Sequence, residues 1–573
     1  MKKSEVVLFM KFHDYPYDRV DYEKSKQWME EKTLALKNAV DYQVFKAVFD
    51  EIQQHNTYCF TMQSLCMIRH SIATQDPFYA EENAYWDEYG PLFDEIHQKF
   101  VKVLLQSPYL EQIKEELPKT YFMILENKEK TFSSEIIKEK QKENALCSEY
   151  QRLIASAQIP FEGEIYTLAM LQKRMQDDHE AARKKAYQAY WGWFQEKENE
   201  VDMIFDQMVH VRDQMAKKLG YDSYTQMSYA ILNRFDYCEE DIKCYRKQVI
   251  EEVVPVANSL YMRQKERLGK DRLECFDENY EFKSGNPKPK YNKDEMVKRA
   301  SKLYHELSKE SGEFFDFMVE HELLDLEAKK GKDMGGFCEY LPYFSSPFIF
   351  SNFNGTSHDV DVLTHEAGHA FQCYTSGNIR PIECIWPGYE SCEIHSMSME
   401  FFAWPWISSF FEEDSEKYYY LHLGGAVKFI PYGILVDHFQ HEVYNHPTMS
   451  IEERKALWRS LERQYLPHKD YESLPFLEKG TWWMKQAHIF MSPFYYVDYT
   501  LAQACALQFW ARLYHKDESA WDDYYKICQV GGTLTFREIV HLANLKVPFE
   551  EGCLNDVMKQ VNGYLSAIHD KEL

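Results

Sequence analysis

The spacing of apolar residues predicts α-helices over most of the first half of the chain. Apolar residues recur there every three or four positions between polar ones, which is the period of an amphipathic helix. The clearest case is residues 177–219, expected as one helix or as two with a bend near Gly192, and with Gly220 as the C-cap. A second helix is expected over residues 239–268, where Pro255 should kink or divide it.

The pattern changes in the middle of the chain. Residues 276–292 are polar, contain a glycine and two prolines, and indicate a long excursion or a linker before helices resume at Lys293. Residues 329–356 mix glycines and prolines with short runs of aromatic and β-branched residues, which predicts strands and turns and therefore a small sheet. Helices are expected again over residues 359–374, 389–411, 417–446, 450–462, 501–515 and 549–567.

Composition supports a large and mostly helical protein. A chain of 573 residues can bury a sizeable core without disulfide or metal cross-links. Its 22 glycines and 20 prolines are fewer than the usual ~7% and ~5% of residues, which favours helices over strands and turns. The 13 cysteines include no CxxC pair, so neither a disulfide framework nor a thiolate zinc cluster is indicated, and a reducing compartment fits best.

The net charge argues against several classes of partner. The chain has 66 Lys plus Arg against 92 Asp plus Glu, and the formal charge of -26 disfavours binding to nucleic acid or to an anionic membrane. The apolar run at residues 6–10 is too short for the core of a signal peptide, and no apolar stretch reaches the length of a membrane span. A cytoplasmic protein is therefore expected, and nothing in the sequence indicates its oligomeric state.

One pentapeptide, HEAGH, has the pattern of a metal site. The chain contains five His-Glu dipeptides, and the one at His365 is followed four residues later by a second histidine, His369. On a helix these two residues lie on one face a turn apart, so their imidazoles can bind one ion. Glu366 is rotated around the helix and can reach the attacking water without being a ligand, as zinc-assisted hydrolysis requires. The alternative is an ordinary helix that happens to contain two histidines.

A catalytic zinc usually takes three protein ligands, so a further ligand is required. The segment GYESCEIHSMSMEFF offers Glu390, Glu393 and Glu400, with His395 as another candidate. Glu393 and Glu400 are seven residues apart and share a helix face, so one could bind the metal while the other supports a histidine ligand. Gly368 is unfavourable inside a helix and indicates either close helix packing or room beside the metal.

A second cluster of polar side chains lies around a proline further along the chain. The segment QAHIFMSPFYYVDYTLAQ contains His488, Tyr495, Tyr496 and Tyr499. Imidazole or phenol groups beside a zinc ion could stabilise the oxyanion of a tetrahedral intermediate in peptide hydrolysis. The alternative is aromatic packing, which is the commoner role of such a cluster.

These motifs resemble a known family of zinc metallopeptidases. The segments GKDMGGFCEYLPYFSSPFIFSNFNGT, DVLTHEAGHAF, ESCEIHSMSMEFF and HIFMSPFYYVDYTLA are similar to blocks of the thimet oligopeptidase and oligoendopeptidase F family, in its bacterial oligoendopeptidase or Pz-peptidase-like branch. The resemblance covers most of the chain. It implies a mostly α-helical, two-lobed fold with a deep substrate channel and a small β-sheet beside the HExxH helix. It also implies an N-terminal helical lobe over residues 1–200 and a catalytic lobe over residues 201–573.

The resemblance assigns the metal site residue by residue. It makes His365, His369 and Glu393 the ligands of one zinc ion per chain. It makes Glu366 the general base, and it leaves Glu400 as support for a ligand.

The resemblance also assigns the second cluster. Tyr499 aligns with the tyrosine that stabilises the transition state, and either Tyr495 or Tyr496 is its companion. His488 matches the histidine that precedes this block. The segment SSPFIFSNFNG would be the edge strand that pairs with the substrate backbone.

The sequence therefore predicts a zinc-dependent oligoendopeptidase that hydrolyses internal bonds of short unfolded peptides, with oligopeptides as its partners. One alternative is a zinc carboxypeptidase or dipeptidase with the same motif, and another is a non-catalytic helical scaffold that binds peptides. Cys373 and Cys392 lie beside the motif, and they are either buried small residues or the source of thiol sensitivity.

Overall fold

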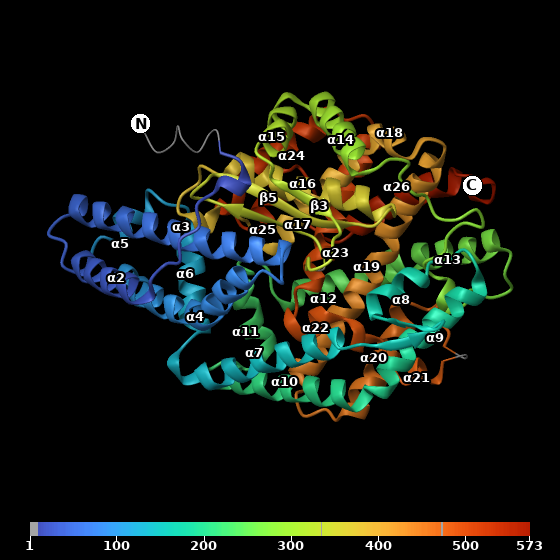
Figure 1. Ribbon diagram of the computed structural model, residues 1–573, viewed down its shortest axis with the longest axis horizontal. Coiled ribbons are helices and arrows are strands. Elements are labelled where there is room, and N and C mark those ends of the chain that lie inside the picture. The colour runs from blue at the N-terminus through green and yellow to red at the C-terminus, as the bar shows by residue number, and fades with distance from the viewer. Residues whose placement is uncertain (1–9, 334, 472–473) are drawn as a thin grey trace. The chain divides into compact units, whose positions relative to one another are not determined.

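A computed structural model describes residues 10–333, 335–471 and 474–573 (Figure 1). The chain is 71% helical and its sheets are small, which confirms the predicted mostly α-helical fold. Most of the apolar run at residues 6–10 lies outside the described residues. The chain forms two compact units, and each is built from three separate segments. The expected division of roles between residues 1–200 and 201–573 stays a prediction.

The first unit comprises Met1–Glu129, Lys288–Glu413 and Arg512–Leu545. Its N-terminal helices pack around a core that includes Phe45, Phe49 and Phe100, all of which are buried. The helices of four or more residues in this unit are α2 (Tyr22–Lys37), α3 (Tyr42–Ile72), α4 (Pro77–Leu105), α5 (Leu110–Lys114), α6 (Lys119–Thr131), α14 (Lys293–Leu307), α15 (Lys309–Glu320), α16 (His358–Ser376), α17 (Tyr389–Phe402), α18 (Ser408–Phe411), α24 (Ser519–Val530) and α25 (Phe536–Leu542).

A three-stranded sheet in the first unit precedes α16, as the sequence predicts. Its strands are β3 (Leu324–Glu327), β4 (Phe337–Leu341) and β5 (Ser346–Phe353), in the order β3-β5-β4. Strand β5 is parallel to β3 and antiparallel to β4. Figure 1 shows this sheet beside α16, which packs on β4, β5, α17 and α24.

The sheet topology corrects one expectation. The segment SSPFIFSNFNG was expected to be an edge strand, but it forms β5, which is hydrogen-bonded on both sides. Its residues Ser346–Ser351 are all buried, as is usual for a central strand. A composition rich in aromatic and β-branched residues predicts a strand but does not distinguish its centre from its edge. The edge strands are β3 and β4.

The second unit comprises Lys130–Pro287, Asp414–Ala511 and Lys546–Leu573. A two-stranded antiparallel hairpin, β1 (Ile159–Phe161) and β2 (Glu164–Tyr166), is its small sheet. The helices of four or more residues are α7 (Ile137–Ala155), α8 (Leu168–Arg174), α9 (Glu180–Glu196), α10 (Glu198–Lys218), α11 (Tyr224–Ile231), α12 (Glu239–Gln248), α13 (Val254–Leu268), α19 (Ser415–Asn445), α20 (Ile451–Tyr465), α21 (Pro475–Glu478), α22 (Ala487–Met491), α23 (Tyr496–Tyr514) and α26 (Cys553–Ala567).

Two long helices predicted in this unit are interrupted. Residues 177–219 divide at Lys197 rather than near Gly192, because Glu198 starts a new helix with acids in its favourable first turn. Residues 239–268 are divided by a π-helical segment, Val249–Val253, which ends just before Pro255. Proline fits the first turn of α13, where its missing N–H leaves no helical bond unmade, so this prediction is confirmed.

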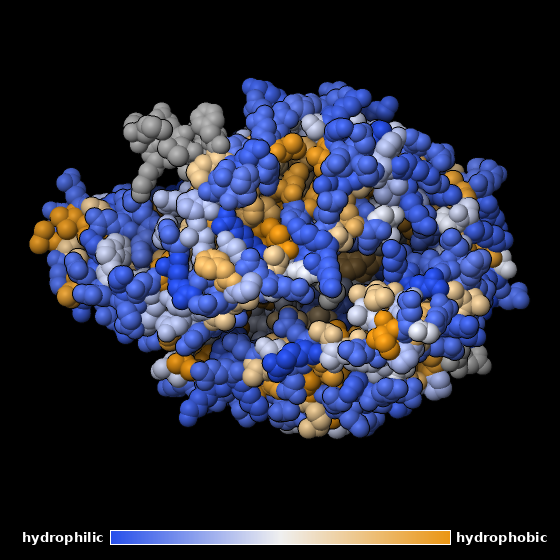
Figure 2. All heavy atoms as spheres, viewed as in Figure 1, coloured by the Kyte–Doolittle hydropathy of each residue, from blue (hydrophilic) through white to orange (hydrophobic). Residues whose placement is uncertain are grey.

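The surface is predominantly polar on the face seen in Figure 2, where hydrophobic residues form small separate groups. This agrees with the excess of acidic over basic side chains in the sequence. Among the described residues, no helix combines the length and the apolar character needed to cross a membrane.

Candidate metal centre

Helix α16 presents both histidines of the HEAGH pentapeptide on one face. The rings of His365 and His369 lie 5.1 Å apart, one helical turn from each other. The start of the helix is fixed by Asp359, whose carboxylate accepts hydrogen bonds from the N–H groups of Asn354 (2.9 Å) and Gly355 (2.7 Å). The helix therefore begins at the end of β5, and the two histidines follow at a fixed distance from the sheet.

Helix α17 brings a carboxylate to the two histidines. Glu393 Oε2 lies 3.3 Å from His365 Nε2 and 3.5 Å from His369 Nε2. In the part of the chain that the structure describes, these three residues form the one group of potential metal ligands whose donor atoms all lie within 4.8 Å of one another. The other candidates on α17, Glu390 and His395, are not part of this group.

The three donor atoms fit a tetrahedral zinc ion. At zinc–ligand distances of about 2.1 Å, tetrahedral donors lie roughly 3.4 Å apart. The two separations from Glu393 Oε2, 3.3 and 3.5 Å, match this value. Two imidazoles and one carboxylate are also the donor set of many catalytic zinc sites, which leaves a fourth position for water or substrate. We conclude that the residues present suit zinc.

Glu400 orients one of the histidines. Its Oε1 lies 2.7 Å from His365 Nδ1, so the opposite ring nitrogen, Nε2, faces Glu393. Burial alone would lower the pKa of His365, but hydrogen bonds and charges from Glu393 and Glu400 hold this pKa well above its usual value. Burial alone would raise the pKa of Glu393, but His369 and His365 hold it well below its usual value. The site therefore favours an ionised carboxylate, as a metal ligand requires.

Two neighbours of the site were not identified from the sequence. The hydroxyl of Ser396 donates a hydrogen bond to Glu393 Oε2 (3.0 Å), and its spacing of three residues from Glu393 on a helix is the signal that could have suggested this. The ring of Trp386 lies 6.1 Å from that of His369, edge to face. It comes from the segment between α16 and α17, where no local pattern indicates such a contact.

Gly368 lies where α16 and α17 are closest. A β-carbon added to this residue would be 2.6 Å from the carbonyl oxygen of His395 and 2.7 Å from Cα of Ser396. Both atoms belong to the backbone of α17, so no side chain can move aside to make room. Of the two explanations for this glycine, close helix packing is therefore the one that the structure supports.

Glu366, on α16, is buried beside Gly336, the residue that precedes β4. Glu366 is 7% exposed, and a β-carbon added to Gly336 would lie 3.6 Å from Glu366 Oε1. Burial raises the pKa of Glu366, and the nearby His365 and His369 offset part of this effect. A buried carboxyl group beside a metal site is suited to exchanging protons with a water molecule.

The two cysteines near the motif are buried. Burial raises the pKa of the Cys373 thiol well above its usual value. The thiol of Cys392 donates a hydrogen bond to the carbonyl oxygen of Pro387 (3.4 Å). Burial disfavours the reactive thiolate form, so both residues fit the interpretation of buried small side chains, and thiol sensitivity stays a prediction.

The second predicted cluster belongs to the second unit, around the start of α23. The rings of Tyr495 and Tyr499 lie 4.7 Å apart, and the ring of His488 lies 6.0 Å from that of Tyr499 and 5.0 Å from that of Tyr496. His488 Nδ1 is 2.9 Å from the side-chain nitrogen of Gln486. The structure thus brings the four predicted side chains together, whereas their role as oxyanion donors stays a prediction.

Comparison with known proteins gives a consistent result. A family profile described as the Peptidase M3 N-terminal domain matches residues 12–132, and one described as Peptidase family M3 matches residues 174–558. A search of the curated proteins returned no match.

Solved structures resemble the chain over nearly its whole length. A structure of Pz peptidase A with an inhibitor is 45% identical, with a TM-score of 0.93, and the match covers 98% of this chain and 100% of that one. A structure of oligoendopeptidase F from Bacillus anthracis str. Ames is 46% identical, with a TM-score of 0.89, and the match covers 98% and 99% of the two chains.

Proposed function

The chain belongs to peptidase family M3 and is a metalloendopeptidase, and from this premise we propose that it is a zinc-dependent oligoendopeptidase acting on internal bonds of short unfolded peptides. The observation that carries the zinc dependence is the group of His365, His369 and Glu393, in which Glu393 Oε2 lies at tetrahedral separations, 3.3 and 3.5 Å, from both histidine Nε2 atoms. We assign all three as ligands of one zinc ion per chain.

We assign Glu366 as the general base. Zinc, when bound, would polarise the scissile carbonyl group and make a water molecule more acidic. Glu366 accepts a proton from the attacking water and later passes it to the leaving amine. Its burial favours this exchange, because a carboxyl group whose pKa is raised is a stronger base for the proton of the attacking water.

We assign Tyr499 as the principal donor to the oxyanion of the tetrahedral intermediate, with His488 and either Tyr495 or Tyr496 assisting it. The clustering of these four side chains around the start of α23 supports this assignment. The tilted ring of Tyr495 lies 4.7 Å from that of Tyr499 and the edge-on ring of Tyr496 lies 5.7 Å from it, so the closer contact favours Tyr495 as the companion.

We further propose that the peptide substrate extends along β4, the edge strand that lies next to Glu366. Among the described residues β4 pairs with a strand on one side only, and Gly336 brings the backbone just before β4 close to the Glu366 carboxylate. Backbone pairing gives affinity with little dependence on side chains, which suits an enzyme that degrades varied peptides.

The test is cleavage of a mixed peptide library, blocked at both termini, with and without a chelator. We expect internal cleavage that stops on chelation and returns with zinc. A carboxypeptidase or dipeptidase would leave the blocked peptides intact and cut the same peptides with free ends. A peptide-binding scaffold would bind them, cut none and contain no stoichiometric zinc.

A further inference from the structure

The turn before α23 has a backbone conformation that side chains rarely adopt. Phe494, two residues before the helix, has a φ angle of 66°, in the left-handed region. Its side chain is fully buried. For a bulky residue this conformation is unfavourable, so it persists where surrounding groups enforce it, and such residues are common at functional sites.

Two buried side chains hold both polar groups of the Phe494 backbone. The N–H group donates to Gln440 Oε1 (3.2 Å), and the carbonyl oxygen accepts from Arg234 Nη2 (2.6 Å). Gln440 lies on α19, and Arg234 follows α11. The Arg234 side chain is completely buried. The turn is therefore held from two elements that are remote from it in sequence.

Arg234 also connects the turn to the first part of α23. The same Nη2 donates to Asp498 Oδ1 (2.8 Å), and both side chains are completely buried. The guanidinium lies over the ring of Tyr229, 4.5 Å from its centroid. Asp498 immediately precedes Tyr499. One buried cation thus fixes both the turn and the helical segment that carries this tyrosine.

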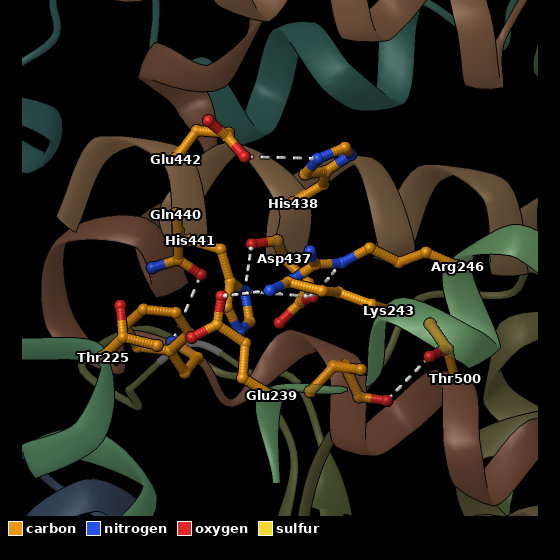
Figure 3. A network of polar contacts seen from close by, with 12 residues as sticks. Thr225, Glu239, Lys243, Arg246, Asp437, His438, Gln440, His441, Glu442 and Thr500 are labelled. Atoms are coloured by element: carbon orange, nitrogen blue, oxygen red, sulfur yellow. Dashed lines mark hydrogen bonds and ion pairs between the residues drawn. The ribbon is translucent and has the colours of Figure 1, made fainter. Parts of the chain in front are cut away.

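The aromatic ring of Phe494 is held by a separate network on α19, part of which is drawn in Figure 3. The ring packs edge to face against the ring of His441 at 4.9 Å. His441 Nδ1 lies 3.3 Å from Asp437 Oδ2, which accepts a hydrogen bond from Arg246 (2.8 Å). Figure 3 shows Asp437, Gln440 and His441 projecting from the same stretch of α19.

We propose that Arg234 and Gln440 are positioning residues that hold the Phe494 turn so that Tyr499 is oriented before the substrate binds. Tyr495 follows Phe494 directly, and its ring lies 4.7 Å from that of Tyr499, so a change in the Phe494 backbone would move one ring relative to the other. The inference rests on the proposed function, in which Tyr499 stabilises the oxyanion. Oxyanion donors contribute most when they need no reorganisation during the reaction.

The first test replaces Arg234 by lysine and uses a matched control elsewhere in the unit. Arg234→Lys keeps the charge but removes the guanidinium that bonds to both Phe494 and Asp498. Arg267→Lys is the control, because Arg267 is 3% exposed and pairs with Glu281 and Asp570 on other elements. We expect Arg234→Lys to lower kcat for a blocked peptide by about 10- to 100-fold with KM within about threefold. Arg267→Lys should keep kcat, although both variants lower the melting temperature.

A second variant tests the same inference in case Arg234→Lys does not fold. Gln440→Met keeps the size of the side chain and removes the acceptor for the Phe494 N–H group. We expect it to lower kcat in the same direction, again without a matching change in KM or in zinc content.

A double-mutant cycle with Tyr499→Phe separates positioning from general damage. If Arg234 acts through Tyr499, then Arg234→Lys should cost much less in the Tyr499→Phe background than in the wild type. Equal losses of kcat in both backgrounds would overturn this inference. So would a kcat of Arg234→Lys and Gln440→Met equal to that of Arg267→Lys. Neither result would contradict the proposed function. A wild-type protein without metal-dependent cleavage would overturn the proposed function as well.

Discussion

Among single residues, Glu366 and Glu393 have the same side chain but lie in surroundings that suit different roles. Glu393 Oε2 lies within 3.5 Å of both imidazole Nε2 atoms, whereas Glu366 is buried against β4 beside Gly336. The histidines lower the pKa of Glu393, and burial raises that of Glu366. One carboxylate is therefore suited to binding a cation and the other to carrying a proton.

The first prediction concerns this division. Glu366→Gln should keep stoichiometric zinc and lower kcat by about 1000-fold or more, because an amide cannot accept the proton of the attacking water. The measurements are turnover of a blocked peptide and zinc content by atomic spectroscopy. Glu393→Gln is the control and should lose zinc together with activity. Activity within tenfold of the wild type in Glu366→Gln would contradict the mechanism.

The second prediction concerns Glu339 on β4, whose carboxylate accepts the N–H group of Tyr340 (2.9 Å). Burial raises its pKa from 4.5 to about 7. The folded protein therefore holds a proton that the unfolded chain releases, so stability should fall as the pH rises from about 4.5 through 7. The loss is at most roughly 3 kcal/mol, since one pKa unit corresponds to ~1.36 kcal/mol.

Glu339→Gln should remove this dependence. The variant should unfold at a higher urea concentration than the wild type at pH 8 and at nearly the same concentration at pH 4.5. If the urea midpoints of the variant and the wild type differed by the same amount at pH 4.5 and at pH 8, Glu339 would not titrate in this range.

Among elements, the contact between α16 and α17 assembles the candidate metal site. His365 and His369 lie on one helix and Glu393 on the other, and Gly368 lets the two backbones approach. Local spacing predicted both helices and the pairing of His365 with His369, whereas the choice of Glu393 among the glutamates of α17 came from the family resemblance. The sequence did not explain Gly368, because the backbone atoms that a β-carbon would meet there belong to another helix, α17.

The third prediction tests this contact. Gly368→Ala should destabilise the protein by about 1–3 kcal/mol and weaken zinc binding, because the added β-carbon meets the backbone of α17 and displaces Glu393. Zinc affinity can be measured by competition with a chromogenic chelator. The control is Gly192→Ala in α9, where nothing lies within 4 Å of an added β-carbon. It should be neutral or stabilising by up to ~1 kcal/mol.

Other elements show what local patterns miss. Pro255 correctly indicated the interruption of a long helix, because proline acts on its own backbone. The sequence did not reveal that β5 is the central strand of the β3-β5-β4 sheet, because strand order depends on partners that are distant in sequence. For the same reason the roles of Arg234 and Gln440 on the Phe494 turn could not be predicted from the segment that contains the tyrosines.

For the whole molecule, the important feature is that each unit is assembled from three segments. The first unit joins its segments through contacts such as the hydrogen bond from Thr120 Oγ1 to the carbonyl oxygen of Gly532 (2.7 Å) and that from the N–H group of Tyr343 to Thr61 Oγ1 (3.1 Å). All three proposed zinc ligands belong to this unit, and the four proposed oxyanion residues belong to the other.

The fourth prediction follows from this division. Zinc at 100 times its dissociation constant would stabilise the unit that binds it by about 2.7 kcal/mol, and chelation removes this contribution. Hydrogen exchange after chelation should therefore become faster in α16 and α17, with α10 and α20 of the second unit as internal references. Equal acceleration in all four helices would contradict binding by the first unit alone.

The segment order also affects when the metal centre can form during synthesis. Helix α24 covers both ligand-bearing helices: Tyr524 donates a hydrogen bond to the carbonyl oxygen of His395 (2.9 Å), and Trp521 stacks on Phe371 at 5.8 Å. These residues leave the ribosome more than a hundred positions after Glu393. A nascent chain that has already exposed its HEAGH segment thus lacks the helix that packs against it. The two ligand-bearing helices therefore cannot reach their final packing until α24 has also been synthesised.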